Sequence, residues 1–96
     1  MTYTYTTEQR FELYSKFGFT EKALSDEYSK IRLEAYRAFG FTEKAFDDEN
    51  FEIRLEAYRT LGVTEKALSD EYSEIRYEAK SYLSLTKEDY NNLISN

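Results

Sequence analysis

The chain is dominated by one 22-residue unit that occurs three times in direct succession. The copies span 20–41, 42–63 and 64–85, and each begins with Thr-Glu-Lys-Ala. A partial copy at 10–19 precedes them, and another partial unit begins at 86. Because a unit this short cannot bury its apolar side chains alone, it must stack on its neighbours. We therefore predict one repeat domain over 1–96, with an N-terminal arm and cap at 1–19 and a cap helix at 86–96.

Each copy carries the signals of a short helix followed by a longer one. In the first copy, Thr20 is the expected N-cap of a short helix over 21–24, and Gly40 is the expected end of a helix that begins near residue 28. Ahead of the copies, Thr6 and Gln9 have the spacing of a capping box. Residues 1–5 are expected to form a short extended arm or a frayed end. The predicted fold is all-α.

The longer helix carries apolar side chains on two sides. In the first copy Ile31 and Ala35 share one side, whereas Leu33 and Tyr36 lie on another. A helix with two apolar sides is covered by neighbours on both, as in a stacked array. The small residue at Ala35 recurs in every full copy and allows two backbones to approach closely.

The last copy departs from this pattern. Lys80, Ser81 and Ser84 replace the repeated tyrosine, arginine and glycine, and Thr86 is expected to begin a final helix. That helix has its apolar residues on one side: Tyr90, Leu93 and Ile94. One apolar and one polar side are typical of a terminal cap.

Charge and composition narrow the classes of function. The chain has 19 acidic and 13 basic residues, a net charge of −6, and the whole excess lies in 42–96. This sign argues against direct binding of nucleic acid, which needs clustered Lys and Arg. The negative charge would favour binding to a partner with a basic surface, or it keeps the protein soluble. Solubility is the simpler explanation of the charge. No apolar run approaches the ~20 residues of a membrane span, and the start lacks the regions of a signal peptide. We expect a soluble, cytoplasmic protein.

Residues that carry chemistry are sparse. The chain has no cysteine and no histidine, so it lacks a thiolate nucleophile, the commonest general base and the commonest transition-metal ligand. The acidic run at 47–49 lacks the spacing of a calcium-binding loop and is better explained by helix capping. We predict no catalytic residue, no metal site, no cofactor and no enzymatic activity.

Arginine and tyrosine recur at fixed places in the copies. An arginine column could hold a phosphate or carboxylate, and a tyrosine column could form a binding surface. Strict recurrence favours contacts between neighbouring copies for both. The columns are Arg10, Arg32, Arg54 and Arg76, and Tyr14, Tyr36 and Tyr58.

The consensus of the copies, ALSDEYSEIRLEAYRTLG, resembles HEAT-like and leucine-rich-repeat-variant units. The likeness covers 10–96 and rests on the pairs Ile31-Arg32, Ile53-Arg54 and Ile75-Arg76 and on a turn acid, Asp26, Asp48 and Asp70. It implies a right-handed α-solenoid used as a binding surface, in which the aspartate and arginine columns hydrogen-bond between successive copies. The unit is shorter than a HEAT repeat and lacks its frequent proline. The iron–sulfur cluster that some variant proteins carry does not transfer, because there is no cysteine.

We predict an interaction module that binds another protein through the exposed acidic face of the long helices. Positions that vary between the copies are not constrained by contacts between stacked copies. With the constant positions beside them on the exposed side of the long helices, they form a strip of mixed but mainly acidic charge. The predicted partner-binding residues are Lys30, Glu34, Arg37, Glu52, Glu56, Arg59, Thr60, Glu74, Glu78 and Tyr82.

Other hypotheses remain beside this one. The short acidic repeats also resemble those of bacteriophage proteins, which suggests an inhibitor that blocks the nucleic-acid-binding surface of a host protein. Such an inhibitor would bind in a strongly salt-dependent way. Self-association by stacking of the chain ends is a further option, and an engineered repeat protein is another, against which the uneven copies argue.

Overall fold

The computed structural model describes residues 4–95, without the side chains at 85–87, 89–91 and 93–95 of the last helix. Residues 1–3 of the predicted arm at 1–5, and the side chains of the predicted apolar side of the final helix, therefore lie outside what the structure describes. The described part is all-helical, as predicted, and contains no strand. It divides into two compact units, Met1–Thr42 and Glu43–Asn96. The boundary also separates the neutral part of the chain from the part that carries the net charge of −6.

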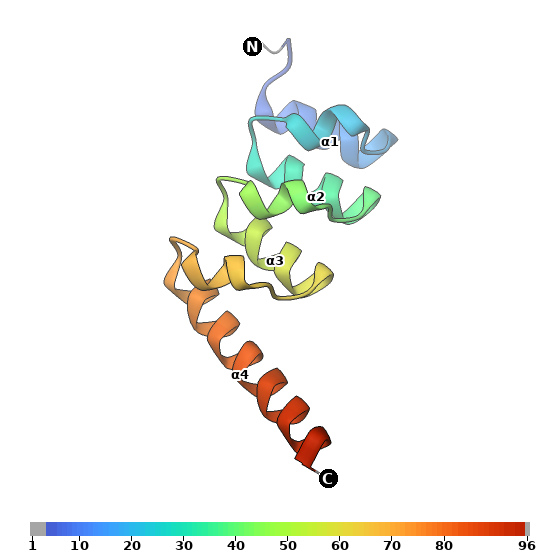
Figure 1. Ribbon diagram of the computed structural model, residues 1–96. Helices are drawn as coiled ribbons and strands as arrows, with labels where there is room; N and C mark the ends of the chain where they lie inside the picture. The colour runs from blue at the N-terminus through green and yellow to red at the C-terminus, as the bar shows by residue number, and fades with distance from the viewer. Residues whose placement is uncertain (1–3, 96) are drawn as a thin grey trace. The chain divides into compact units, whose positions relative to one another are not determined.

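The first unit consists of α1 (Thr7–Phe17), the 3₁₀ helix η1 (Glu21–Ser25) and α2 (Ser29–Phe39) (Figure 1). The predicted capping box is confirmed, because the Thr6 hydroxyl accepts from the Gln9 amide at 3.2 Å and the Gln9 side chain accepts from the Thr6 amide at 3.0 Å. Thr20 occupies the N-cap of η1, but its side chain makes no capping hydrogen bond. The helix order therefore follows the prediction, while one of the predicted caps is missing.

The second unit consists of η2 (Glu43–Asp47), α3 (Phe51–Leu61), η3 (Glu65–Ser69) and α4 (Ser73–Ser95) (Figure 1). Asn50 caps α3, with its side-chain oxygen accepting from the amides of Glu52 at 2.9 Å and Ile53 at 3.3 Å. The short helices are 3₁₀ rather than α, since an isolated turn of α-helix has too few hydrogen bonds to offset its ordering.

The prediction of a separate cap helix that begins at Thr86 is wrong, because α4 runs without interruption from Ser73 to Ser95 (Figure 1). The earlier long helices end at Gly18, Gly40 and Gly62, where φ lies between 102° and 112°. Only glycine adopts this backbone conformation readily. Ser84 holds the equivalent place in the last copy, so the helix continues through it.

Corresponding residues form the core of each unit. In the first, Ala23, Ile31 and Ala35 are buried against Phe11 and Tyr14. In the second, the buried cluster comprises Tyr58, Ala67, Ile75 and Ala79, with Leu55 and Phe51 packed against it. In each unit, the short helix and the long helix that follow therefore pack against the side chains of the preceding long helix. The alanines that recur in the full copies are buried.

An arginine–aspartate clamp joins successive elements in both units. Arg10 donates through Nε and Nη2 to both carboxylate oxygens of Asp26, at 2.8 and 2.9 Å. Arg54 holds Asp70 in the same way, at 2.9 and 3.1 Å. For these two pairs, the hydrogen bonds between successive copies that the resemblance implied are present.

Each clamped aspartate also begins the next long helix. Asp26 Oδ1 accepts from the Tyr28 amide and Asp70 Oδ1 from the Tyr72 amide, both at 2.9 Å. Burial alone would raise the pKa of both carboxyls, but the arginine and backbone hydrogen bonds outweigh it and lower the pKa below the ordinary value. Both groups are therefore held as carboxylates.

Candidate protein-interaction surface

The predicted strip lies largely on the surface of the long helices. In the first unit Lys30 and Arg37 are exposed and Glu34 is half-buried, all on α2. In the second unit Glu56 on α3 and Glu78 on α4 are half-buried. The other members on these two helices are exposed: Glu52, Arg59, Thr60, Glu74 and Tyr82. The exposure that a binding role requires is therefore present.

All three members of the strip in the first unit make local contacts. The Arg37 guanidinium donates to Glu34 Oε1 at 2.8 Å, one turn away on α2. The Lys30 ammonium lies 4.7 Å from the centre of the Phe11 ring, a cation–π distance. The cations of this unit are thus partly occupied by their own neighbours.

The second unit brings α3 and α4 together through an exposed ion pair. Arg59 donates from Nε and Nη2 to the two carboxylate oxygens of Glu78, at 2.8 and 2.9 Å. Hydrogen bonds from Arg59 lower the pKa of Glu78, and Glu78 in turn raises the pKa of Arg59. The carboxylates of Glu56 and Glu74 raise the Arg59 pKa further. One arginine is therefore surrounded by three acids, which leaves this surface acidic.

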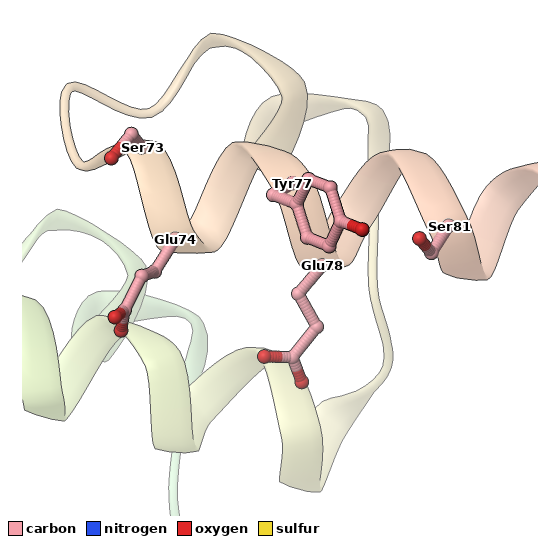
Figure 2. A pocket seen from close by; sticks show the side chains of 5 residues that line it. All are labelled: Ser73, Glu74, Tyr77, Glu78 and Ser81. Atoms are coloured by element: carbon pink, nitrogen blue, oxygen red, sulfur yellow. The ribbon is translucent and has the colours of Figure 1, made fainter.

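A shallow hollow runs along α4 beside this ion pair. Its five lining residues, Ser73, Glu74, Tyr77, Glu78 and Ser81, all belong to that helix (Figure 2). Its volume is about 630 Å³, which lies within the range of small-molecule pockets. A hollow lined by one helix, however, encloses nothing and suits a macromolecular contact better than a small ligand.

Tyr77 was not among the predicted site residues. Its side chain is 76% exposed, and it projects from α4 in Figure 2. It occupies the place of Phe11 and Leu55, which are half-buried in the cores of their units. The signal was present in the sequence, because a tyrosine replaces an aliphatic residue only in the last full copy.

The acidic turn at 47–49 is occupied by local contacts. Asp48 Oδ1 accepts from the Asn50 amide at 2.9 Å, and Asp47 pairs with the Lys66 ammonium. Among the described residues no group of three or more Asp and Glu side chains is placed to hold a metal ion. In the same part of the chain, no helix combines the length and apolar character needed to span a membrane.

Comparison with known proteins yields no relative: no protein-family model, curated protein or solved structure matches the chain. The function of this surface is therefore inferred from its own contacts, exposure and charge.

Proposed function

We propose that the chain is a right-handed α-solenoid module, of the HEAT-like kind that its repeat resembles, and that it binds another protein without catalysing a reaction. The partner contacts the exposed acidic face of the long helices. In the second unit this face consists of Glu52, Glu56, Arg59 and Thr60 from α3 and Glu74, Glu78 and Tyr82 from α4.

The acidic surroundings of Arg59 carry this proposal. Glu74, Glu78 and Tyr82 follow one another at four-residue intervals, so they share one side of α4. That side combines two carboxylates with a tyrosine that is 50% exposed. Tyrosine supplies a large contact area at little cost in conformational entropy, and flanking charges add specificity. The combination suits a protein surface that presents basic side chains.

Charge reversal on the face tests the proposal. The variant Glu52→Lys/Glu56→Lys/Glu74→Lys is compared with a control, Glu21→Lys/Glu43→Lys/Glu65→Lys, which changes the net charge equally through exposed residues of the 3₁₀ helices. Both are used to capture proteins from a bacterial lysate, after circular dichroism has shown that each is folded. A stoichiometric partner retained by the wild type and the control, but not by the face variant, supports the proposal. Equal retention by all three would show that the face is wrongly chosen.

The alternative is an acidic inhibitor that occupies the nucleic-acid-binding surface of a host protein. One observation favours it: the entire net charge of −6 lies in the second unit, together with the Arg59 surface. Its complex would weaken steeply between 50 and 500 mM salt, as expected of exposed charges, and would be displaced by added DNA or RNA. A complex that resists both treatments would leave the ordinary interaction module as the explanation.

A further inference from the structure

The last arginine of the column is held like the others but has no carboxylate. Arg54 donates through Nη1 to the Asp48 carbonyl at 2.8 Å, and Arg76 donates through Nη1 to the Asp70 carbonyl at 2.6 Å. In Arg54 the remaining Nε and Nη2 bind Asp70. Among the described residues, the same two atoms of Arg76 have no acceptor. The Nε and Nη2 edge of the Arg76 guanidinium, which in Arg54 binds the Asp70 carboxylate, is therefore open.

The residue at the clamp spacing cannot fill this edge. The clamped aspartates lie 16 residues after their arginines, and the residue 16 places after Arg76 is Asn92. It belongs to the same uninterrupted helix α4. Sixteen residues of α-helix rise about 24 Å, so Asn92 lies far beyond the reach of an arginine side chain.

The neighbours of Arg76 are also uncovered. Ser73, Tyr77 and Lys80 take the places that Phe51, Leu55 and Tyr58 hold on α3, where η3 and α4 pack. All three are exposed. The receiving side of α4 thus offers a guanidinium edge, an aromatic ring and an ammonium group.

We propose that Arg76, Tyr77 and Lys80 form a docking site for an acidic segment of a partner protein, in which an aspartate carboxylate binds the open edge of Arg76. Charge complementarity supports an acidic occupant, because the site carries two cations. Glu74 and Glu78 lie two positions from Arg76, and residues so spaced do not face each other on a helix. Tyr77 lines the hollow together with Glu74 and Glu78, so the site borders the acidic face described above, while its two cations favour an occupant of the opposite charge.

The Arg10–Asp26 and Arg54–Asp70 clamps indicate the sequence that the acidic segment needs. In each, the aspartate is followed by a glutamate, whose carboxylate lies 3.6 Å from Arg10 or 3.8 Å from Arg54. An Asp-Glu turn preceded by a short helical stretch thus matches the arginine edge. A second copy of this chain is a poor occupant, since none of its three turn aspartates is free.

A peptide titration tests the proposal on the full chain. The probe is the acetylated, amidated peptide TEKALSDEYSE, which reproduces residues 64–74, and its control carries asparagine in place of the aspartate. Nuclear magnetic resonance follows the Nε–H signal of Arg76 and the backbone of 73–80 at 150 mM salt, where repulsion beyond about 8 Å is screened. We expect saturable shifts with a millimolar dissociation constant, and at least tenfold weaker binding of the control peptide.

Two variants and one competitor complete the design. Arg76→Lys keeps the charge but removes the two-pronged edge, and peptide binding should weaken about tenfold. The Lys80 side chain has no partner among the described residues, and Lys80→Gln should weaken peptide binding less than Arg76→Lys does. If Arg76→Lys loses the spectrum of the folded state, the comparison of the two peptides on the wild type still decides. Any of four results would overturn the proposal. These are equal chemical-shift changes from both peptides, chemical-shift changes from inorganic phosphate equal to those from the aspartate peptide, no change at 5 mM peptide, or concentration-dependent self-association through 73–80. Failure here would leave the acidic face untouched, because the two sites share no residue.

Discussion

Arginine has two distinct roles in this molecule, and burial separates them. The Arg54 and Asp70 side chains are 7% and 5% exposed, whereas those of Arg59 and Glu78 are 58% and 40% exposed. Both pairs are two-pronged and have similar distances. A buried pair depends on both partners, since removal of one leaves an uncompensated charge away from water. An exposed pair is screened by solvent and contributes little.

This difference gives a prediction about stability. Arg54→Ala should lower the free energy of unfolding by about 3 kcal/mol, because Asp70 is then left buried without its partner. Arg59→Ala should lower it by less than about 1 kcal/mol. Urea titrations followed by circular dichroism measure both. Similar losses for the two variants would contradict the assignment of Arg54 to the scaffold and Arg59 to the surface.

The clamped aspartates also set the response to acid. Their pKa values are lowered in the folded chain, so the unfolded chain takes up protons first as the pH falls. The stability they confer is complete above the unfolded value of about 3.9 and is lost as the pH falls through the lower folded values. Melting temperatures from pH 7 to pH 2 should be level and then drop below about pH 4. The double variant Asp26→Asn/Asp70→Asn should be less stable at pH 7 and show a shallower drop; an equally steep drop would assign the acid response to other groups.

Tyr58 offers a stabilising substitution. Its hydroxyl is buried and has no hydrogen-bond partner among the described residues. Burial, and then the charge of Asp70, raises the pKa of this phenol. A buried hydroxyl without a partner costs about 1 kcal/mol or more, so Tyr58→Phe should raise the free energy of unfolding by about that amount. Tyr77→Phe, at an exposed position, should leave it unchanged. A loss of stability in Tyr58→Phe would mean that the hydroxyl is satisfied in solution.

At the scale of the elements, local signals in the sequence predicted much of what is seen. Thr6 with Gln9 predicted the start of α1, and the glycines predicted the ends of α1, α2 and α3. The same logic applied to Ser84 indicates one continuous last helix, and it outweighs the cap that Thr86 suggests. The 3₁₀ form of the short helices has no comparable signal, because it reflects the small number of hydrogen bonds in so short a segment. Exposure of Tyr77 follows from the uninterrupted course of α4 through position 84, because no short helix turns back onto this side of α4 among the described residues.

Exchange of glycine and serine tests the termination rule. Gly62 has φ at 112°, and no atom lies within 4 Å of an added Cβ, so Gly62→Ala should lose about 1–3 kcal/mol from backbone strain alone. Ser84→Ala should be neutral or slightly stabilising, because alanine favours the helix interior. Ser84→Gly should reduce the helical signal and increase amide exchange after residue 84. A neutral Gly62→Ala would contradict the account of how the long helices end.

At the scale of the whole molecule, the copies share packing positions but differ in charge. Corresponding residues build the cores of both units, yet only the second carries net negative charge. The sequence predicted the helical class and the surface location of the strip, because both follow from apolar periodicity. It could not predict that Arg59 and Glu78 would bind each other, since that contact depends on how α3 and α4 pack.

The dissociation constant of the complex with the captured partner tests the central claim most directly. Calorimetry would compare the wild type, the face variant Glu52→Lys/Glu56→Lys/Glu74→Lys and the matched control Glu21→Lys/Glu43→Lys/Glu65→Lys. We expect the face variant to bind about 100-fold more weakly, which corresponds to roughly 1 kcal/mol for each reversed charge, and the control to bind within threefold of the wild type. Equal affinities for all three proteins would show that binding does not use the acidic face of the long helices.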